Sequence, residues 1–157
     1  KELEFQTHEL NRHIADNVLT LLKNDEELLP LQISDSTKLS IVYLEDFNYH
    51  TFDTTINSFH KATSYSINSK TTPEQTDSIL TSLTNSDIII TLASGGVNQT
   101  KKNNYGISQN TLDAIAKIQD LDKKNILVLF ANPYAQCLGL GPDLPLRFGK
   151  FRYTMRI

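Results

Sequence analysis

Residues 87–93, Asp-Ile-Ile-Ile-Thr-Leu-Ala, are followed at once by Ser94-Gly95-Gly96 and decide the fold of this chain. Five of the seven residues are apolar and three in a row are isoleucine. Such a run, ended by a glycine pair, is typical of a strand buried on both faces at the middle of a parallel sheet. The flanking residues 73–84 and 108–119 are predicted to be amphipathic helices. A buried strand between two helices indicates an α/β unit.

Further strands and helices follow the same alternation along the chain. Apolar runs predict strands at 38–44, 63–67 and 125–130, and a helix is predicted at 51–61 with Phe52, Ile56 and Phe59 facing inward. This order predicts a three-layer α-β-α sandwich with a mainly parallel, flavodoxin-like sheet. With the strands numbered along the chain, the expected order in the sheet is 2-1-3-4. The strand at 87–93 would then lie between the strands at 38–44 and 125–130.

The beginning of the chain is predicted to be one long helix over residues 6–24. Its apolar residues recur at the 3.6-residue period of a helix and predict a single buried stripe. The stripe consists of Leu10, Ile14, Val18, Leu21 and Leu22.

Two later helices carry start signals. Thr72, Pro73 and Gln75 form the pattern of a capping box with proline in the first turn. Ser108 is placed to cap the helix at 108–119, where Ile107 and Leu112 have the spacing of a hydrophobic staple.

The last 22 residues differ in composition from the rest of the chain. Residues 136–157 carry four Lys or Arg and one Asp, a net charge of +3, which leaves −6 for residues 1–135. Apolar and polar residues alternate over 151–157, which predicts a half-exposed edge strand. We therefore expect an α/β domain at 1–135 and an atypical tail at 136–157, and we hypothesise that a frame shift or a vector supplied this tail.

Composition excludes several classes of function. The chain has 157 residues, a formal net charge of −3 and a single Cys137, with a pI near 5.8. This charge argues against a nucleic-acid partner, and no window approaches the roughly 20 apolar residues of a membrane span. His8 and His13 are five residues apart rather than four, so no metal site is predicted. No phosphate-binding glycine motif is complete, and no cofactor is expected.

Ligands of open α/β sheets bind beyond the carboxyl ends of the strands, here at the loops 45–50 and 94–106. The second loop contains no Asp, Glu or His, so its side chains supply no general acid or base. Its polar residues can still bind a ligand by hydrogen bonds. Glu45 and Asp46, in the first loop, are expected to be solvated acids. The candidate substrate-proximal residues are Ser94, Gly95, Gly96, Asn98, Asn103, Asn104 and Tyr105.

Four short segments of the chain resemble glycoside hydrolase family 3. Residues 18–24 (VLTLLKN) and 28–31 (LLPL) resemble the join between the two domains of these enzymes. Tyr-Gly-Ile-Ser at 105–108 and Phe-Ala-Asn-Pro-Tyr-Ala at 130–135 resemble the β-N-acetylglucosaminidase (β-hexosaminidase) branch, with Ala131 in place of the usual glycine. The matches span residues 8–135, and 136–157 resembles nothing in the family.

The resemblance implies an auxiliary C-terminal domain of a retaining, exo-acting β-N-acetylglucosaminidase. The catalytic aspartate and the acid/base of this branch lie on a preceding (β/α)₈ barrel, so no catalytic residue is expected in this chain and we expect it to be inactive alone. The implied partners are that barrel and a glycan containing N-acetylglucosamine. A periplasmic or other extracytoplasmic location is favoured by the resemblance only.

Two other readings of the sequence remain open at this stage. The first is a stand-alone flavodoxin- or receiver-like binding module. A receiver would require a phosphorylatable Asp where Ser94-Gly95-Gly96 stands, and Glu45-Asp46 is unfavourable for the phosphate of a flavin. The second is a free-standing enzyme, for which the sequence offers neither nucleophile nor acid/base.

Overall fold

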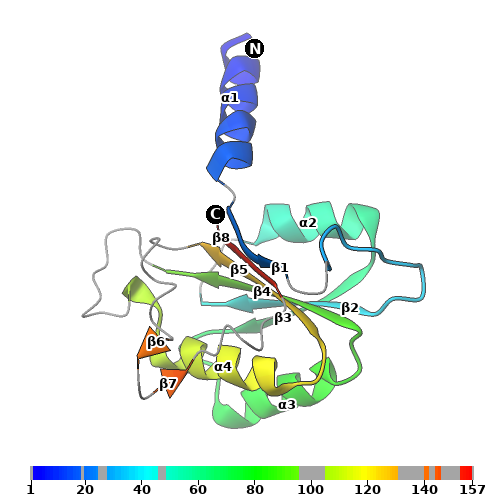
Figure 1. The fold of residues 1–157 in the computed structure, drawn as a ribbon, viewed down its shortest axis with the longest axis vertical. Helices are drawn as coiled ribbons and strands as arrows, with labels where there is room; N and C mark the ends of the chain where they lie inside the picture. Colours follow the sequence, from blue (N-terminus) through cyan, green and yellow to red (C-terminus); the bar gives the residue numbers. More distant parts are fainter. Residues whose placement is uncertain are drawn as a thin grey trace.

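The computed structural model describes residues 2–18, 20–24, 28–45, 49–95, 105–130, 140–141, 144–145 and 153–156. Four helices and eight strands lie in these ranges (Figure 1). The helices are α1 (Glu2–Val18), α2 (His50–Phe59), α3 (Pro73–Leu83) and α4 (Gln109–Asp120). The strands are β1 (Thr20–Asn24), β2 (Leu39–Leu44), β3 (Ala62–Ile67), β4 (Ile88–Ser94), β5 (Lys124–Phe130), β6 (Leu140–Gly141), β7 (Leu144–Pro145) and β8 (Tyr153–Arg156).

Six strands form one sheet in the order β1-β8-β5-β4-β2-β3. The four strands β3, β2, β4 and β5 are parallel, which confirms the predicted order 2-1-3-4. β4 lies at their centre, and its residues 88–93 are all buried. The predicted strand at 87–93 is therefore confirmed, both in its position and in its burial on two faces.

The tail strand has a different position from the one predicted. β8 pairs in parallel with β5 and antiparallel with β1, so it lies inside the sheet rather than at its edge. β1 takes the edge position instead. The prediction was wrong because the strand at 20–24 was not recognised, and only the tertiary structure brings it beside residues 153–156. β6 and β7 form a separate two-stranded antiparallel pair.

The predicted helix over 6–24 is confirmed for residues 6–18 and wrong for residues 20–24. α1 ends at Val18, and Thr20–Asn24 is extended as β1. The backbone groups of β1 bond to β8, with a register shift between Leu21 and Lys23. Cross-strand pairing thus overrides the local helical period. Three residues of the predicted buried stripe, Leu10, Ile14 and Leu21, are exposed, so this part of the prediction is wrong as well.

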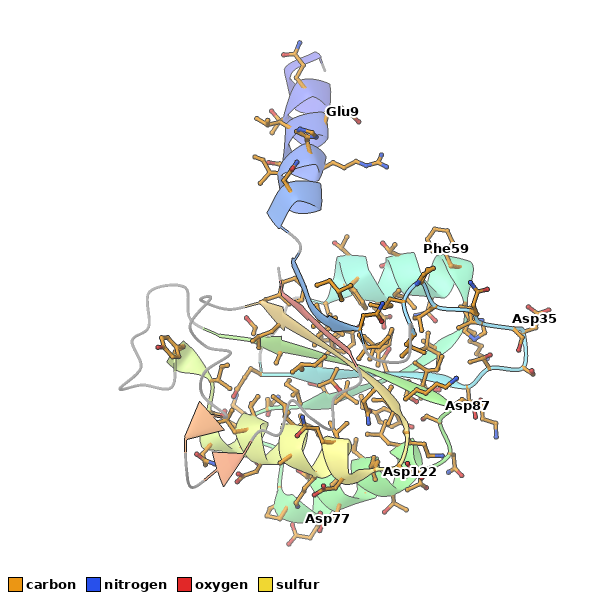
Figure 2. All side chains as sticks on the ribbon, in the orientation of Figure 1. Glu9, Asp35, Phe59, Asp77, Asp87 and Asp122 are labelled. Carbon is orange, nitrogen blue, oxygen red and sulfur yellow. The ribbon has the colours of Figure 1, made fainter. Side chains whose placement is uncertain are left out.

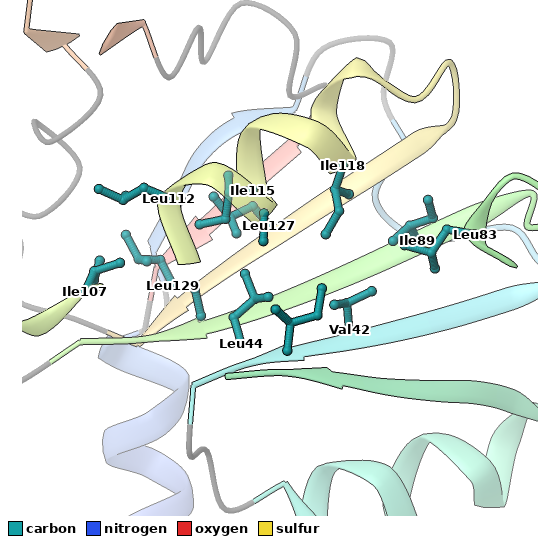
Figure 3. Packing of buried hydrophobic residues seen from close by; sticks show 13 residues of the cluster. Val42, Leu44, Leu83, Ile89, Ile107, Leu112, Ile115, Ile118, Leu127 and Leu129 are labelled. Atoms are coloured by element: carbon teal, nitrogen blue, oxygen red, sulfur yellow. The ribbon is translucent and has the colours of Figure 1, made fainter. Parts of the chain in front are cut away.

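One face of the sheet is covered by α3 and α4. Leu112, Ile115 and Ile118 of α4 point at the strands and meet residues such as Leu127 and Leu129 of β5 (Figure 3). From α3, Leu83 is fully buried and Ile79 and Leu80 pack against the same cluster. The prediction that both segments form amphipathic helices is confirmed.

The opposite face is covered by α2 and by the segment that follows β1. Phe52 and Ile56 pack against the strands here, as predicted, together with the partly buried Leu28, Leu29 and Leu31. Phe59, the last residue of α2, was expected inward but is 82% exposed, so that part of the prediction is wrong. Helices on both faces confirm the three-layer sandwich.

The start signals of both helices are confirmed. The Thr72 hydroxyl accepts from the Gln75 amide at 3.3 Å, and the Gln75 side chain accepts from the Thr72 amide at 2.9 Å. The Ser108 hydroxyl accepts from the Thr111 amide at 3.2 Å. Ile107 and Leu112, the predicted staple, are both buried in the same cluster.

Candidate functional site

The carboxyl ends of the four parallel strands are joined by backbone hydrogen bonds. The Glu45 amide, after β2, donates to the Ile67 carbonyl at the end of β3 at 2.9 Å. The Gly95 amide, after β4, donates to the Phe130 carbonyl at the end of β5, also at 2.9 Å. These bonds continue the sheet by one residue on each side of the β2–β4 pair. The edge from which the predicted site extends is therefore hydrogen-bonded on both sides.

Three of the seven predicted site residues lie within the described part of the chain. Ser94 and Gly95 form the first root of the loop and are partly buried. Tyr105 and Gly106 form the second root with φ of 52° and 80°, and Tyr105 packs against the core beneath α4. The remaining candidates, Gly96, Asn98, Asn103 and Asn104, lie outside the described residues. The contact of this loop with a substrate stays a prediction.

Glu45 connects the end of β2 with the start of α4. Its Oε1 accepts from the Ser108 amide at 3.3 Å and from the Thr111 hydroxyl at 2.5 Å. A carboxylate at a helix N-terminus is favoured by the partial positive charge of the first-turn amides. Its backbone lies in the left-handed region, with φ of 66°. A non-glycine residue there requires support from its surroundings.

The expectation that Glu45 is a solvated acid is therefore wrong. Ser108 and Thr111 lie more than sixty residues away in sequence, so no local pattern could reveal this contact. Asp46, the second acid of the pair, lies outside the described residues.

Asn68 makes a second connection between a strand end and α4. The Asn110 side-chain amide donates to the Asn68 carbonyl at 2.9 Å. The Asn68 Oδ1 accepts from the Lys70 backbone amide at 2.9 Å, and the Asn68 backbone amide donates to the Thr71 hydroxyl. This is the local turn geometry that asparagine favours. With Glu45, it fixes the first turn of α4 against two strands.

A polar cluster under α2 was not found from the sequence. The Tyr43 hydroxyl donates to Asp53 Oδ1 at 3.2 Å, and the Ser64 hydroxyl donates to the same oxygen at 2.5 Å. The Tyr43 ring stacks on Tyr49 with a centroid distance of 4.2 Å and meets Phe52 edge-on at 6.5 Å. The available signal was the position of Asp53 beside Phe52 on the inward side of the helix.

Burial and the neighbouring Asp53 carboxylate raise the pKa of the Tyr43 hydroxyl well above its ordinary value. The phenol is therefore a neutral hydrogen-bond donor at physiological pH. It ties β2 to α2, and Ser64 ties β3 to the same carboxylate. The Glu45 and Asp53 carboxylates are thus both engaged in holding the fold.

Two cavities lie at the other end of the sheet, beside the amino ends of the strands. The larger has a volume of about 480 Å³ and includes Asp87, Asp122, Lys123 and Lys124 in its lining. Figure 2 shows Asp35, Asp87 and Asp122 at this end. The Asp87 carboxylate accepts from the Lys38 amide at 2.8 Å, so it serves the connection into β2. Acids and lysines are balanced in this lining, which singles out no class of ligand.

The described residues offer no group of three or more His, Cys, Asp or Glu suited to a metal ion. None of the described helices is long and apolar enough to cross a membrane. What the described part of the carboxyl edge can supply is hydrogen bonding from Ser94, Gly95 and Tyr105. The geometry provides a hydrogen-bonded sheet edge from which the polar loop extends.

Comparison with solved structures identifies relatives of this fold. A fungal multi-domain glycoside hydrolase family 3 β-N-acetylglucosaminidase matches 96% of this chain with a TM-score of 0.70 and 16% identity. The family 3 β-N-acetylglucosaminidase from Paenibacillus sp. str. FPU-7 matches 94% with a TM-score of 0.67 and 12% identity. A Bifidobacterium adolescentis family 3 β-glucosidase matches 87% with a TM-score of 0.57 and 11% identity.

The chain spans only a minor part of these enzymes, 16%, 26% and 22% of their respective lengths. No family model and no curated protein matches its sequence. At these identities the likeness establishes the fold alone. The compared enzymes with this fold belong to the family that the sequence motifs resemble. A small portion of each enzyme matches nearly the whole of this chain.

Proposed function

We propose that this chain is the auxiliary C-terminal domain of a retaining, exo-acting β-N-acetylglucosaminidase of glycoside hydrolase family 3. The catalytic (β/α)₈ barrel of that enzyme would lie in a part of the protein outside this chain. The observation that carries the proposal is the fold match, which takes in almost all of this chain and at most 26% of the compared enzymes.

The carboxyl edge of the sheet supports an auxiliary role. A retaining glycosidase needs a carboxylate nucleophile and an acid/base that flank the glycosidic bond. Glu45 and Asp53 instead accept hydrogen bonds from Thr111, Tyr43 and Ser64. The loop 94–106 has no Asp, Glu or His. Its two described roots are fixed on the sheet, which suits a loop that contributes hydrogen bonds to a site built by another domain.

The engagement of Glu45 also counts against the receiver-like alternative. A receiver uses paired acids after its first strand to hold a metal ion, and here the Glu45 carboxylate is turned toward α4. The Phe-Ala-Asn-Pro-Tyr segment at 130–134 resembles the β-N-acetylglucosaminidase branch. For this reason we prefer N-acetylglucosaminidase activity over β-glucosidase activity. Both activities occur among the compared enzymes, so the sugar is the finer part of the proposal.

A paired assay tests the proposal. The purified chain and the full product of its gene are each incubated with p-nitrophenyl N-acetyl-β-glucosaminide and with p-nitrophenyl β-glucoside. Release of nitrophenol from the first substrate by the full product only is the expected result. Turnover by this chain alone would contradict the auxiliary role. Preference of the full product for the glucoside would contradict the sugar assignment.

A further inference from the structure

The smaller of the two cavities at the amino ends of the strands lies on the face of the sheet that α3 and α4 cover. It has a volume of about 330 Å³, at the lower end of the range for small-molecule sites. Its lining includes Lys38 and Ser40 from the start of β2, Lys61 and Thr63 from the start of β3, and Ser86 after the end of α3. We call this space the amino-edge cavity.

The cavity exists because the side chains on this face of β2 and β3 become small and polar toward the amino end. Successive side chains of a strand point to opposite faces, so every second residue shares a face. The first two of the three paired positions on this face belong to the core cluster, and the third consists of hydroxyl residues. From the carboxyl end, the pairs are Leu44 with Ile67, Val42 with Tyr65, and Ser40 with Thr63.

Two lysines follow the hydroxyl residues at the outer end of the same face. Lys38 precedes β2 by one residue and Lys61 precedes β3 by one residue. Since Leu39 pairs with Ala62, the register continues outward to Lys38 beside Lys61. Neighbouring strands lie about 4.8 Å apart, so two positive charges are held close together at the cavity. Like charges at this separation repel, and an anion between them would relieve the repulsion.

The two ammonium groups are not neutralised within the described ranges of the chain. Neither Lys38 nor Lys61 makes a side-chain ion pair or hydrogen bond there. A lysine at the start of an edge strand discourages pairing with another sheet, which would explain Lys61 on β3. It would not explain Lys38, because β2 is an inner strand. The paired charges therefore remain available to a ligand.

Groups that would oppose an anion are exposed or bonded elsewhere. Asp35 is the one acid among the described lining residues, and it is exposed to solvent. The Asp87 carboxylate accepts from the Lys38 backbone amide at 2.8 Å. The end of α3 carries partial negative charge on its last carbonyls. The carbonyls of residues 81–83 accept from the backbone amides of residues 84–86, so they are already satisfied.

A buried pair of hydroxyls also lines the cavity. Ser40 and Ser86 are each 4% exposed, and their hydroxyl oxygens lie 2.7 Å apart. The pair has two protons, and the bond between the two oxygens uses one of them. Among the described residues, the second proton meets no acceptor. A buried donor without a partner costs free energy, which an acceptor oxygen of a ligand would recover.

We propose that the amino-edge cavity binds a small molecule through a phosphate or sulfate group. Lys38 and Lys61 neutralise the charge of this group, and the Ser40–Ser86 pair donates its unused proton to one of the oxygens. The oxygens of such a group act as acceptors, which matches a lining of ammonium and hydroxyl donors. The cavity lies at the opposite end of the strands from the loop 94–106, and the proposal does not depend on the glycosidase function.

A nuclear magnetic resonance titration of the isotope-labelled 157-residue chain provides the test. The probes are inorganic phosphate, glycerol phosphate and glycerol, at an ionic strength held constant with sodium chloride. We expect saturable shifts of the amides of residues 38–40, 61–63 and 84–86 with both phosphates and none with glycerol. The amides of Gly95 and Phe130, at the opposite edge of the sheet, should stay unchanged and serve as internal controls.

The probes also distinguish the source of the bound group. Equal affinity for both phosphates would support a site for the free ion, and tighter binding of glycerol phosphate would support a site for a phosphate ester. Either result would confirm the oxyanion chemistry. No saturable shift with either phosphate, or equal shifts with glycerol and glycerol phosphate, would overturn the proposal.

Two matched variants connect binding to the lysine pair. Lys61→Ser should weaken phosphate binding at least about tenfold, because a charged donor is lost. Lys70→Ser removes the same charge from an exposed position beyond the other end of β3 and should bind phosphate like the unmodified chain. Lys38→Ser is an independent second variant and should behave like Lys61→Ser. Equal weakening by Lys61→Ser and Lys70→Ser would indicate general attraction of anions and would overturn the site.

Discussion

The central strand β4 and the first helix α1 both carry regular apolar patterns, yet they have opposite environments. Residues 88–93 of β4 are buried between two layers of helices, whereas Leu10 and Ile14 of α1 face solvent. The β4 pattern is completed by neighbours within this chain, on both sides and on both faces. Among the described residues, the α1 pattern finds no such neighbours, since Leu10 and Ile14 are exposed. An apolar period thus predicts that a face is to be covered, and it does not say which chain or domain covers it.

The largest expected effect comes from truncating one isoleucine in each region. Ile89→Ala should lower the free energy of unfolding by about 3 kcal/mol, because a fully buried side chain leaves a cavity. Ile14→Ala in the same chain should change it by less than about 0.5 kcal/mol, since the side chain is half exposed. Urea unfolding followed by circular dichroism measures both. Comparable losses would break the comparison, because α1 would then belong to the core.

The contact of Glu45 tests how far tertiary hydrogen bonds support the sheet edge. Glu45→Ala should lower the free energy of unfolding by about 2 kcal/mol, because the Ser108 amide and the Thr111 hydroxyl lose a charged acceptor. Glu45→Gln is the matched control. Glutamine keeps an acceptor oxygen, so Glu45→Gln should lower the free energy of unfolding by less than half as much as Glu45→Ala. If the two substitutions cost the same in urea unfolding, the charge rather than the acceptor would be responsible.

A smaller effect of opposite sign is expected inside β4 itself. The Thr91 hydroxyl is fully buried and has no hydrogen-bond partner within the described part of the chain. Thr91→Val keeps the shape and removes the unsatisfied group, so it should raise the free energy of unfolding by about 1 kcal/mol. Thr111→Val is the contrasting substitution, since it removes a hydroxyl that is bonded to Glu45 and should destabilise. Destabilisation by Thr91→Val would indicate a partner for this hydroxyl.

The smallest effect is expected at the surface of the α3–α4 layer. Lys117 Nζ lies 3.0 Å from Asp77 Oδ1, with side chains 50% and 67% exposed. A double-mutant cycle with Lys117→Ala and Asp77→Ala should give a coupling free energy below about 0.5 kcal/mol that falls as salt is added. A larger coupling that resists salt would show that this pair helps to hold the two helices together.

The core of the fold could be predicted from the sequence because its signals are local. The isoleucine run at 88–90, the capping box of Thr72 and Gln75 and the cap at Ser108 each act within a few residues of the chain. They set the type and order of the elements, and right-handed connection of parallel strands then leaves few arrangements. The candidate loop could be placed by the same reasoning, since it follows a buried strand whose end is marked by glycine.

Contacts between distant segments decided the rest. The pairing of 20–24 with 153–156 turned a predicted helix end into a strand, and the bonds from Ser108 and Thr111 turned a predicted solvated acid into a structural one. The exposure of Leu10 and Ile14 was likewise invisible to a pattern that records only their spacing. Periodicity and capping are properties of neighbouring residues, so the sequence by itself determined the α/β core. Strand partners, carboxylates bonded to distant residues and uncovered faces depend on what the folded chain brings together, and only the tertiary structure determined them.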